Sequence, residues 1–202
     1  MKNSKNILMW SIVALTSASP ISTLSQTIEK QNCSQLKSGT TIQIPVSNPS
    51  FEKVENGAFT GWVALEHVSR GNYEFVSDTE KFKTAPSSLR IKMVKPELYG
   101  LLRQTIQIED CWKGKTATLK GHLSIENAND IGGGLMIQAV QEGNGMLVWN
   151  HMQDNIMRGT SDWAPYSVSL KIPENAYYLR IGVMLQGGGT LWADDLTLEI
   201  SN

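Results

Sequence analysis

The stretch ATLKGHLSIE, residues 117–126, has an apolar or small residue at every second position, with polar residues between them. Successive side chains of a β-strand point to opposite faces of a sheet, so this alternation predicts a strand with one buried and one exposed face. The set that begins at Ala117 and ends at Ile125 is expected to face the core. Lys120 and His122 belong to the opposite, polar set.

The same period of two recurs on both sides of this stretch, and no segment shows a convincing helical period. It appears at residues 89–93, 135–140, 166–171 and 178–185. Turn-forming residues separate these segments, including Asn56-Gly57, Pro173 to Asn175 and Gly187 to Gly189. Many short strands at such spacing are typical of a sandwich or barrel, here of about nine or ten antiparallel strands.

Length and charge exclude several classes of protein. The chain has 202 residues and a net charge of -1, which suits one sizeable domain and lacks the basic excess of a non-specific nucleic-acid binder. Two glycine triplets, residues 132–134 and 187–189, precede strands and not helices. A phosphate-binding loop needs a helix N-terminus behind it, so these triplets are interpreted as turn or bulge glycines.

The N-terminus has the pattern of a secretory signal. Two lysines in the first five residues precede an apolar run over residues 7–18, and small residues at Thr23 and Ser25 favour cleavage before Gln26. We therefore expect a signal peptide at 1–25 and a periplasmic or secreted protein with no stable membrane insertion after cleavage. An uncleaved anchor and a buried helix are the alternatives, although the run is shorter than the roughly 20 residues of a membrane-spanning helix.

Both cysteines, Cys33 and Cys111, lie in the predicted mature chain. An even cysteine count in an exported protein favours a disulfide, which would fasten a polar segment at 26–39 to a domain at 40–202. Two buried thiols are the alternative. A metal or redox site at the cysteines is disfavoured because there is no CxxC pair and no histidine at ligand spacing.

Five phrases of the sequence point to a known family: NPSFE at 48–52, GW at 61–62, SLRI at 88–91, LRQTI at 102–106 and LWADDL at 191–196. They resemble the jelly-roll modules of the galactose-binding-like superfamily, many of which are carbohydrate-binding modules. Three more phrases lie in the second half, MQD at 152–154, GTSDW at 159–163 and YSVSLKIPENA at 166–176. They are similar to a group of secreted bacterial jelly-roll modules found alone or beside hydrolase domains. The resemblance covers about residues 46 to 200, implies a single jelly-roll β-sandwich and suits a carbohydrate-binding function.

One strand departs from these modules and another offers a candidate ligand surface. Met136 and Gln138 stand where such modules often carry Trp and Arg, which weakens the transfer of a sugar-stacking platform. The segment LVWNHM, residues 147–152, includes a polar group in either alternating set, and a dry core would leave that group unpaired. We therefore predict that Trp149 and His151 lie on an exposed sheet face. Lys120, His122, Gln138 and Arg180 are expected to share that face.

An aromatic ring beside planar hydrogen-bonding groups suits a glycan, so the predicted ligand residues are Trp149, His151, Gln138, His122 and Arg180. An ordinary solvated sheet face is the alternative for these residues. The predicted function is an exported, non-catalytic binding module that binds a glycan through the concave sheet face, with a protein–protein interaction or assembly module as the alternative.

An enzyme is less favoured because the three histidines have no nucleophile elbow, HExxH pair or Cys-His arrangement beside them. The best enzymatic alternative is a jelly-roll polysaccharide lyase. It would use His151 and Tyr178 as base and acid, with Gln138 and Arg180 neutralising an acidic sugar.

Jelly-roll modules often hold a structural calcium ion where the first strand meets the last, and calcium takes carboxylate and carbonyl oxygens. The resemblance therefore points to Glu52 with Asp194 or Asp195 as ligands. The alternative is a pair of turn-forming acids that accept hydrogen bonds from backbone amides. No other cofactor is expected.

Overall fold

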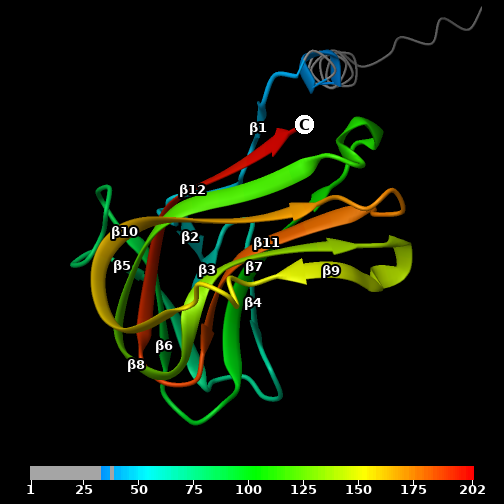
Figure 1. The fold of residues 1–202 in the computed structure, drawn as a ribbon. Helices are drawn as coiled ribbons and strands as arrows, with labels where there is room; N and C mark the ends of the chain where they lie inside the picture. The colour runs from blue at the N-terminus through cyan, green and yellow to red at the C-terminus, as the bar shows by residue number, and fades with distance from the viewer. Residues whose placement is uncertain (1–32, 37–38) are drawn as a thin grey trace, which may run out of the picture.

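The computed structural model describes residues 33–36 and 39–202, and nearly all of their regular secondary structure is β-strand (Figure 1). The predicted signal peptide at 1–25 and most of the predicted polar segment at 26–39 lie outside the described residues. Ten strands form a single continuous antiparallel sheet, and β2 and β3 form a separate hairpin. The elements are β1 (Ile42–Ile44), β2 (Val54–Glu55), β3 (Ala58–Phe59), β4 (Val63–Glu66), β5 (Tyr73–Asp78), β6 (Ser88–Met93), β7 (Tyr99–Gln107), η1 (Asp110–Trp112), β8 (Thr116–Val140), η2 (Glu142–Asn144), β9 (Met146–Asn150), β10 (Met157–Lys171), β11 (Tyr178–Gln186) and β12 (Thr190–Ser201).

Strand β8 belongs to both layers of the sandwich. Its first part, residues 116–126, pairs with β10 on one side and with β12 on the other. Strand β12 also pairs with β1 and β6, and β6 pairs with β5. The last part of β8, residues 132–140, pairs with β11 and β9, and β11 leads through β7 to β4. The strand therefore bends from one layer into the other, and this gives the sheet the curvature of a jelly roll. The predicted fold class is confirmed.

The core lies between the two layers and contains the alternating sets predicted to be buried. Leu119, Leu123 and Ile125 of β8 are completely buried, as are Leu179 and Ile181 of β11. Apolar area removed from water stabilises the fold by roughly 25 cal/mol per Å². A strand with one clearly apolar alternating set therefore turns that set toward the core, because a shift by one residue would expose it to water. The opposite faces of β8 and β11 are therefore left to form surfaces.

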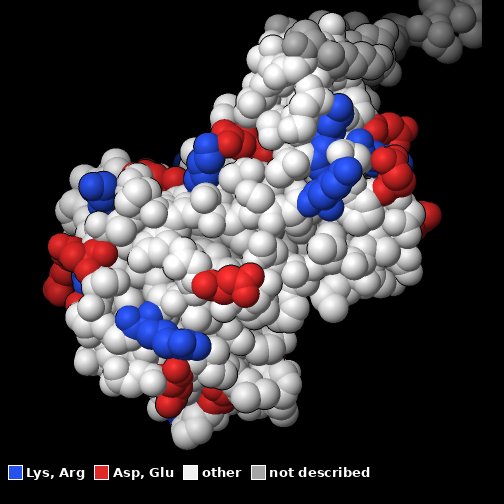
Figure 2. All heavy atoms as spheres, viewed as in Figure 1, with Lys and Arg blue, Asp and Glu red and all other residues white. Residues whose placement is uncertain are grey.

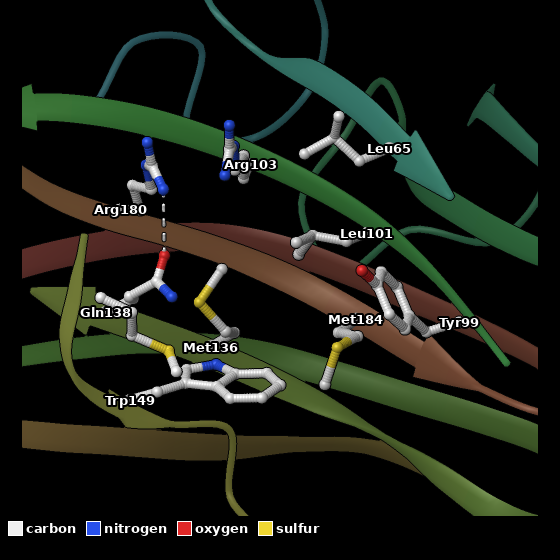
Figure 3. Close-up of a pocket in the computed structure, with 10 residues that line it drawn as sticks. Leu65, Tyr99, Leu101, Arg103, Met136, Gln138, Trp149, Arg180 and Met184 are labelled. Carbon is white, nitrogen blue, oxygen red and sulfur yellow. Dashed lines mark hydrogen bonds between the residues drawn. The ribbon is translucent and has the colours of Figure 1, made fainter. Parts of the chain in front are cut away.

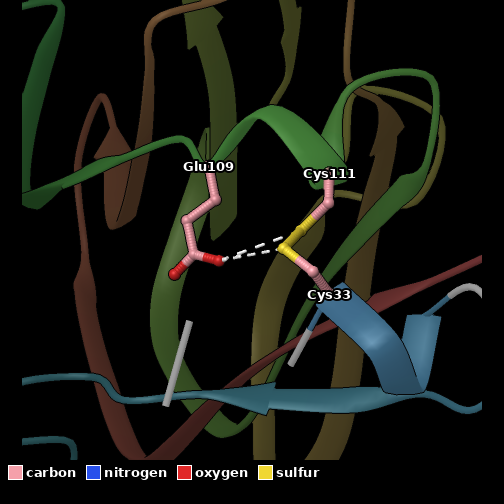
Figure 4. Close-up of a disulfide and its surroundings, with 3 residues drawn as sticks. All are labelled: Cys33, Glu109 and Cys111. Carbon is pink, nitrogen blue, oxygen red and sulfur yellow. Dashed lines mark hydrogen bonds between the residues drawn. A yellow bond between two sulfur atoms is a disulfide. The ribbon is translucent and has the colours of Figure 1, made fainter. Parts of the chain in front are cut away.

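A disulfide joins Cys33 to Cys111, as predicted (Figure 4). Its Cα atoms are 5.6 Å apart, and it links a helical turn at residues 33–36 to η1. Leu36 in that turn is 1% exposed and packs into the core. The Glu109 carboxylate lies 3.8 and 3.9 Å from the two sulfurs, which carry no proton in a disulfide, so these are carboxylate–sulfur contacts. No helix in the part of the chain that the structure describes is long and apolar enough to cross a membrane.

Candidate functional site

A groove of about 230 Å³ lies on the outer face of the layer formed by β4, β7, β11, the end of β8 and β9 (Figure 3). Its floor is a small apolar cluster of Leu101, Met136 and Met184, which is separate from the core between the layers. Leu65 and Tyr99 pack against this cluster from the side of β4 and β7. The groove is lined by Leu65, Tyr99, Leu101, Arg103, Met136, Gln138, Met146, Trp149, Arg180 and Met184.

The register of the sheet explains why these side chains meet. Arg180, Gln138 and Trp149 are directly opposite one another on β11, β8 and β9, so they form one row across the sheet. The next row has Arg103 on β7 and Met136 on β8, with Gly182 of β11 between them. A Cβ at Gly182 would lie 2.6 Å from the Leu102 carbonyl oxygen and 3.0 Å from Leu101 Cδ1, so the glycine allows β7 to pack closely against β11 in this row.

Trp149 forms the aromatic wall of the groove, and 39% of its surface is exposed. The His151 ring stacks on the indole, with ring centroids 4.3 Å apart and planes at 27°. Burial of the imidazole lowers the pKa of His151, so the ring is neutral at pH 7. His151 thus supports the tryptophan and is not itself among the residues that line the groove.

The strand that carries Trp149 is held by its neighbouring asparagine. Asn150 Nδ2 donates to the Ser169 carbonyl of β10 at 2.9 Å, and Asn150 Oδ1 accepts from the Met152 amide at 3.1 Å. These bonds satisfy the polar group that an alternating strand would otherwise bury unpaired. The backbone next to Trp149 is therefore held in place while the indole itself faces solvent.

The polar end of the groove is cationic. Arg180 Nη1 donates to Gln138 Oε1 at 3.4 Å, and Nη2 donates to Asn144 Oδ1 in η2. Burial and the neighbouring Arg180 charge lower the pKa of Arg103, which nevertheless remains a cation. The groove thus combines a ring face, an apolar floor and three planar hydrogen-bonding groups.

Four of the five predicted ligand residues are gathered here, and His122 is not. Trp149, Gln138 and Arg180 line the groove, with His151 stacked behind Trp149. The expectation that His122 and Lys120 share this face is wrong, because they belong to the first part of β8 and hence to the other layer. They line a separate, more open hollow of about 420 Å³ with Tyr166 and other residues.

Sequence reasoning missed Arg103 and Tyr99. Both follow the alternation of β7, but in that strand each alternating set contains large apolar residues, such as Leu101 in one and Leu102 in the other. Periodicity therefore does not decide which set faces the core. Only the pairing of Arg103 with Gly182 places it in the groove.

The carboxylates predicted as calcium ligands lie at a bulge of β12, where the register with β8 shifts between Asp194 and Thr197. Asp194 is fully buried, and it accepts backbone amides of Lys83 at 3.0 Å, of Thr84 at 2.8 Å and of Asp195 at 2.8 Å. Asp195 accepts the hydroxyls of Ser50 and Thr84. Asp194 thus makes the backbone-amide contacts of the alternative interpretation, whereas Asp195 is bonded to side-chain hydroxyls.

Glu52 is exposed and does not complete a ligand cluster with these two acids. Among the described residues, only Cys33, Glu109 and Cys111 bring three such ligand atoms within 4.8 Å of one another. The sulfurs in that group are bonded to each other and so are not thiolate ligands.

The charged residues on the face seen in Figure 2 are scattered, with both signs interspersed and broad uncharged areas between them. This face carries no continuous basic stripe of the kind that tracks a nucleic-acid backbone.

No family model matches the sequence. A curated relative is the uncharacterized HTH-type transcriptional regulator YbfP of Bacillus subtilis, 26% identical over 141 residues, which are 69% of this chain and 47% of that protein. The chain thus spans about half the length of the curated relative it matches.

The similar solved structures include carbohydrate-binding modules and an enzyme. An arabinose-bound α-L-arabinofuranosidase matches with a TM-score of 0.58 and 14% identity, over 80% of this chain and 27% of that one. A family 16 carbohydrate-binding module matches with a TM-score of 0.53 and 16% identity, over 76% of this chain and 97% of that module. A xylan-binding domain of family 22 matches with a TM-score of 0.51 and 13% identity, over 78% of this chain and 97% of that domain. The chain therefore has the jelly-roll fold that these carbohydrate-binding modules share.

Proposed function

We propose that this protein is an exported binding module that holds a glycan in the groove of β7, β11, β8 and β9. The observation that carries the proposal is the position of Trp149, a half-exposed indole fixed by His151 beside Gln138, Arg180 and Arg103. Pyranose rings present apolar C–H faces that pack on aromatic rings, and their hydroxyls bond planar amide and guanidinium groups. The disulfide is in keeping with an oxidising compartment.

The shape of the surface favours a glycan over a protein partner. A flat apolar patch would suit the protein–protein interaction or assembly module that the sequence leaves as an alternative. The apolar residues here instead form the floor of a hollow with polar groups at one end. A hollow with an apolar floor and a few convergent polar groups is typical of a small-ligand or oligosaccharide site.

The lyase alternative receives no support from the groove. Its base and acid would be His151 and Tyr178, and neither lines the groove. His151 stacks behind Trp149, and the Tyr178 ring packs edge-on against Tyr177 with centroids 4.6 Å apart. The proposed role is therefore binding without catalysis.

Replacement of Trp149 by alanine tests the proposed function. We expect glycan affinity to fall about tenfold to hundredfold, the equivalent of roughly 1–3 kcal/mol for a lost apolar contact. The melting temperature should barely change because the ring is half-exposed. The measurements are binding of wild type and W149A on a glycan array, followed by calorimetric titration and thermal melts.

Two results would contradict the proposal. A loss of stability of about 3–5 kcal/mol in W149A, the usual cost of emptying a core aromatic position, would show that Trp149 is structural. Absence of glycan binding by the wild type, with capture of a specific protein partner from periplasmic extract, would favour the interaction module.

A further inference from the structure

We propose that the groove selects glycans that carry an anionic group, a uronate carboxylate or a sulfate ester, which Arg103 and Arg180 hold together. The inference rests on the proposed glycan-binding function and names the chemical class of its ligand. It comes from the charge and hydrogen-bonding inventory of the groove.

The two arginines lie on the same face of adjacent strands. Arg103 of β7 is opposite Gly182 of β11, and Arg180 is two residues before that glycine, so the arginines are diagonal neighbours. Long side chains in this relation reach one another across a sheet. In Figure 3 both guanidinium groups extend from the same side of the sheet above the apolar floor.

No acidic side chain balances this pair. The groove lining contains two arginines and no aspartate or glutamate. The ion pairs formed by the described residues involve neither guanidinium. Burial and the like charge of Arg180 lower the pKa of Arg103, so the two cations repel each other in a partly desolvated place. A bound anion would relieve that repulsion.

The arginines also have unused hydrogen-bond donors. Gln138 and Asn144 orient Arg180 through one hydrogen bond to each terminal nitrogen, and each of these nitrogens has a second N–H left to donate. The Arg180 Nε has no partner among the described residues, but it is buried away from the surface of the groove. Arg103 makes no hydrogen bond or ion pair to a described side chain. A guanidinium offers donors in a planar fork that fits a carboxylate or sulfate.

The acceptors in the groove are few, which disfavours a purely neutral sugar. Each sugar hydroxyl donates as well as accepts, and a neutral ligand therefore needs acceptors on the protein. The lining side chains supply only Gln138 Oε1, already bonded to Arg180, and the Tyr99 hydroxyl as oxygen acceptors. An anionic group accepts without donating, so it matches a surface rich in donors.

Matched polymers test the inference. We would measure binding of the full-length protein to polygalacturonate, alginate and a sulfated galactan, each beside its neutralised form, carboxyl-reduced or desulfated. We expect at least one acidic polymer to bind about tenfold to hundredfold more tightly than its neutral form, since hydrogen bonds to charged groups are the stronger ones. The uronate and sulfate arms tell which anion the pair prefers.

Variants assign the effect to the arginines. R103Q and R180Q should each lower affinity for the acidic polymer toward that of its neutral form, and R103K should recover only part of it because lysine lacks the planar fork. R70Q removes the same charge from an exposed residue outside the groove lining and should leave selectivity unchanged. W149A should instead weaken acidic and neutral forms alike. Thermal melts confirm that each variant is folded.

The outcomes separate this inference from the proposed function. Equal binding of acidic and neutral forms, or selectivity that survives in both R103Q and R180Q, overturns the anionic preference and leaves glycan binding intact. Failure of every acidic and neutral glycan to bind overturns both.

Discussion

At the scale of single residues, the stacked pair Trp149 and His151 shows how one side chain prepares another for binding. The indole has one ring face covered by the imidazole, and the residue remains exposed enough to meet a ligand. A rigid aromatic side chain loses little conformational freedom on binding, so more of the contact energy contributes to affinity.

The imidazole makes folding stability depend on pH. Burial is the cause of the lowered pKa of His151, and no charged neighbour contributes to it. In the unfolded chain a histidine takes up a proton near pH 6.5, whereas folded His151 stays neutral to a lower pH. As pH falls below about 6.5 the unfolded state binds more protons, so the free energy of unfolding decreases.

We therefore expect wild type to lose more stability than H151Q between pH 7.5 and pH 5. Urea midpoints at several pH values measure this difference. The other two histidines are present in both proteins, so the comparison isolates position 151. Parallel pH profiles for wild type and H151Q would contradict the assignment.

At the scale of elements, the bulge in β12 is held together by a buried carboxylate. Asp194 accepts three backbone amides, which satisfies donors of the segment before β6 and of the bulge itself. Burial raises the pKa of Asp194. The backbone amides that donate to Asp194 oppose this rise because they stabilise the charged form.

Replacement of Asp194 by asparagine should destabilise the fold. Both oxygens of the Asp194 carboxylate accept backbone N–H groups, but the asparagine side chain has only one acceptor oxygen. Its NH₂ group would face a backbone N–H, so at least one buried N–H loses its acceptor. The expected cost is about 1–3 kcal/mol in the free energy of unfolding, measured by urea denaturation. D195N is the matched control with a smaller loss, since Asp195 is half-buried and accepts hydroxyls. A D194N midpoint equal to wild type would rule out this role.

Calcium at the same bulge stays a prediction. An ion that binds only the folded state stabilises it by RT ln(1 + [L]/Kd), about 2.7 kcal/mol at a hundredfold excess over Kd. We then expect EDTA to lower the melting temperature by several degrees and added calcium, but not magnesium, to restore it. An unchanged melt with EDTA, on protein shown by elemental analysis to be metal-loaded, would remove Glu52, Asp194 and Asp195 as ligands.

At the scale of the whole molecule, the disulfide fastens the N-terminal turn to the sandwich across 78 positions of sequence. The turn also contributes buried Leu36, whose carbonyl accepts from Asn202 Nδ2 at 2.9 Å near the C-terminus. The bridge thus joins both ends of the described chain to η1.

Loss of the bridge should lower global stability without changing the groove. A cross-link of this span stabilises by about 2–4 kcal/mol, chiefly by restricting the unfolded chain. The double variant C33S/C111S should therefore unfold at lower urea, while its glycan affinity, measured where it is fully folded, should equal that of wild type. An unchanged urea midpoint would contradict the structural role.

How far sequence predicts this molecule differs between the fold and the site. The alternation of β8, β10 and β11 predicts the sandwich because burial of one face is a local property of each strand. The cysteine pair likewise follows from an even count of two. Gln138 and Arg180 could be predicted because each alternates with a clearly apolar set on its own strand. Trp149 could be predicted because its strand also contains polar residues that an apolar core would leave unpaired.

The amino-acid sequence by itself determined which faces of β8, β10 and β11 turn toward the core, because a period of two leaves one clearly apolar set on each of these strands and water rejects it. It did not determine the buried face of β7, where both alternating sets contain large apolar residues. It did not determine which exposed faces meet. His122 and Gln138 lie on one strand, and only the bend of β8 separates them into different layers. Arg103 joins Arg180 only through the register of β7 with β11. Pairing between strands distant in sequence is set by the packing of the whole core, and so the tertiary structure alone decided the groove.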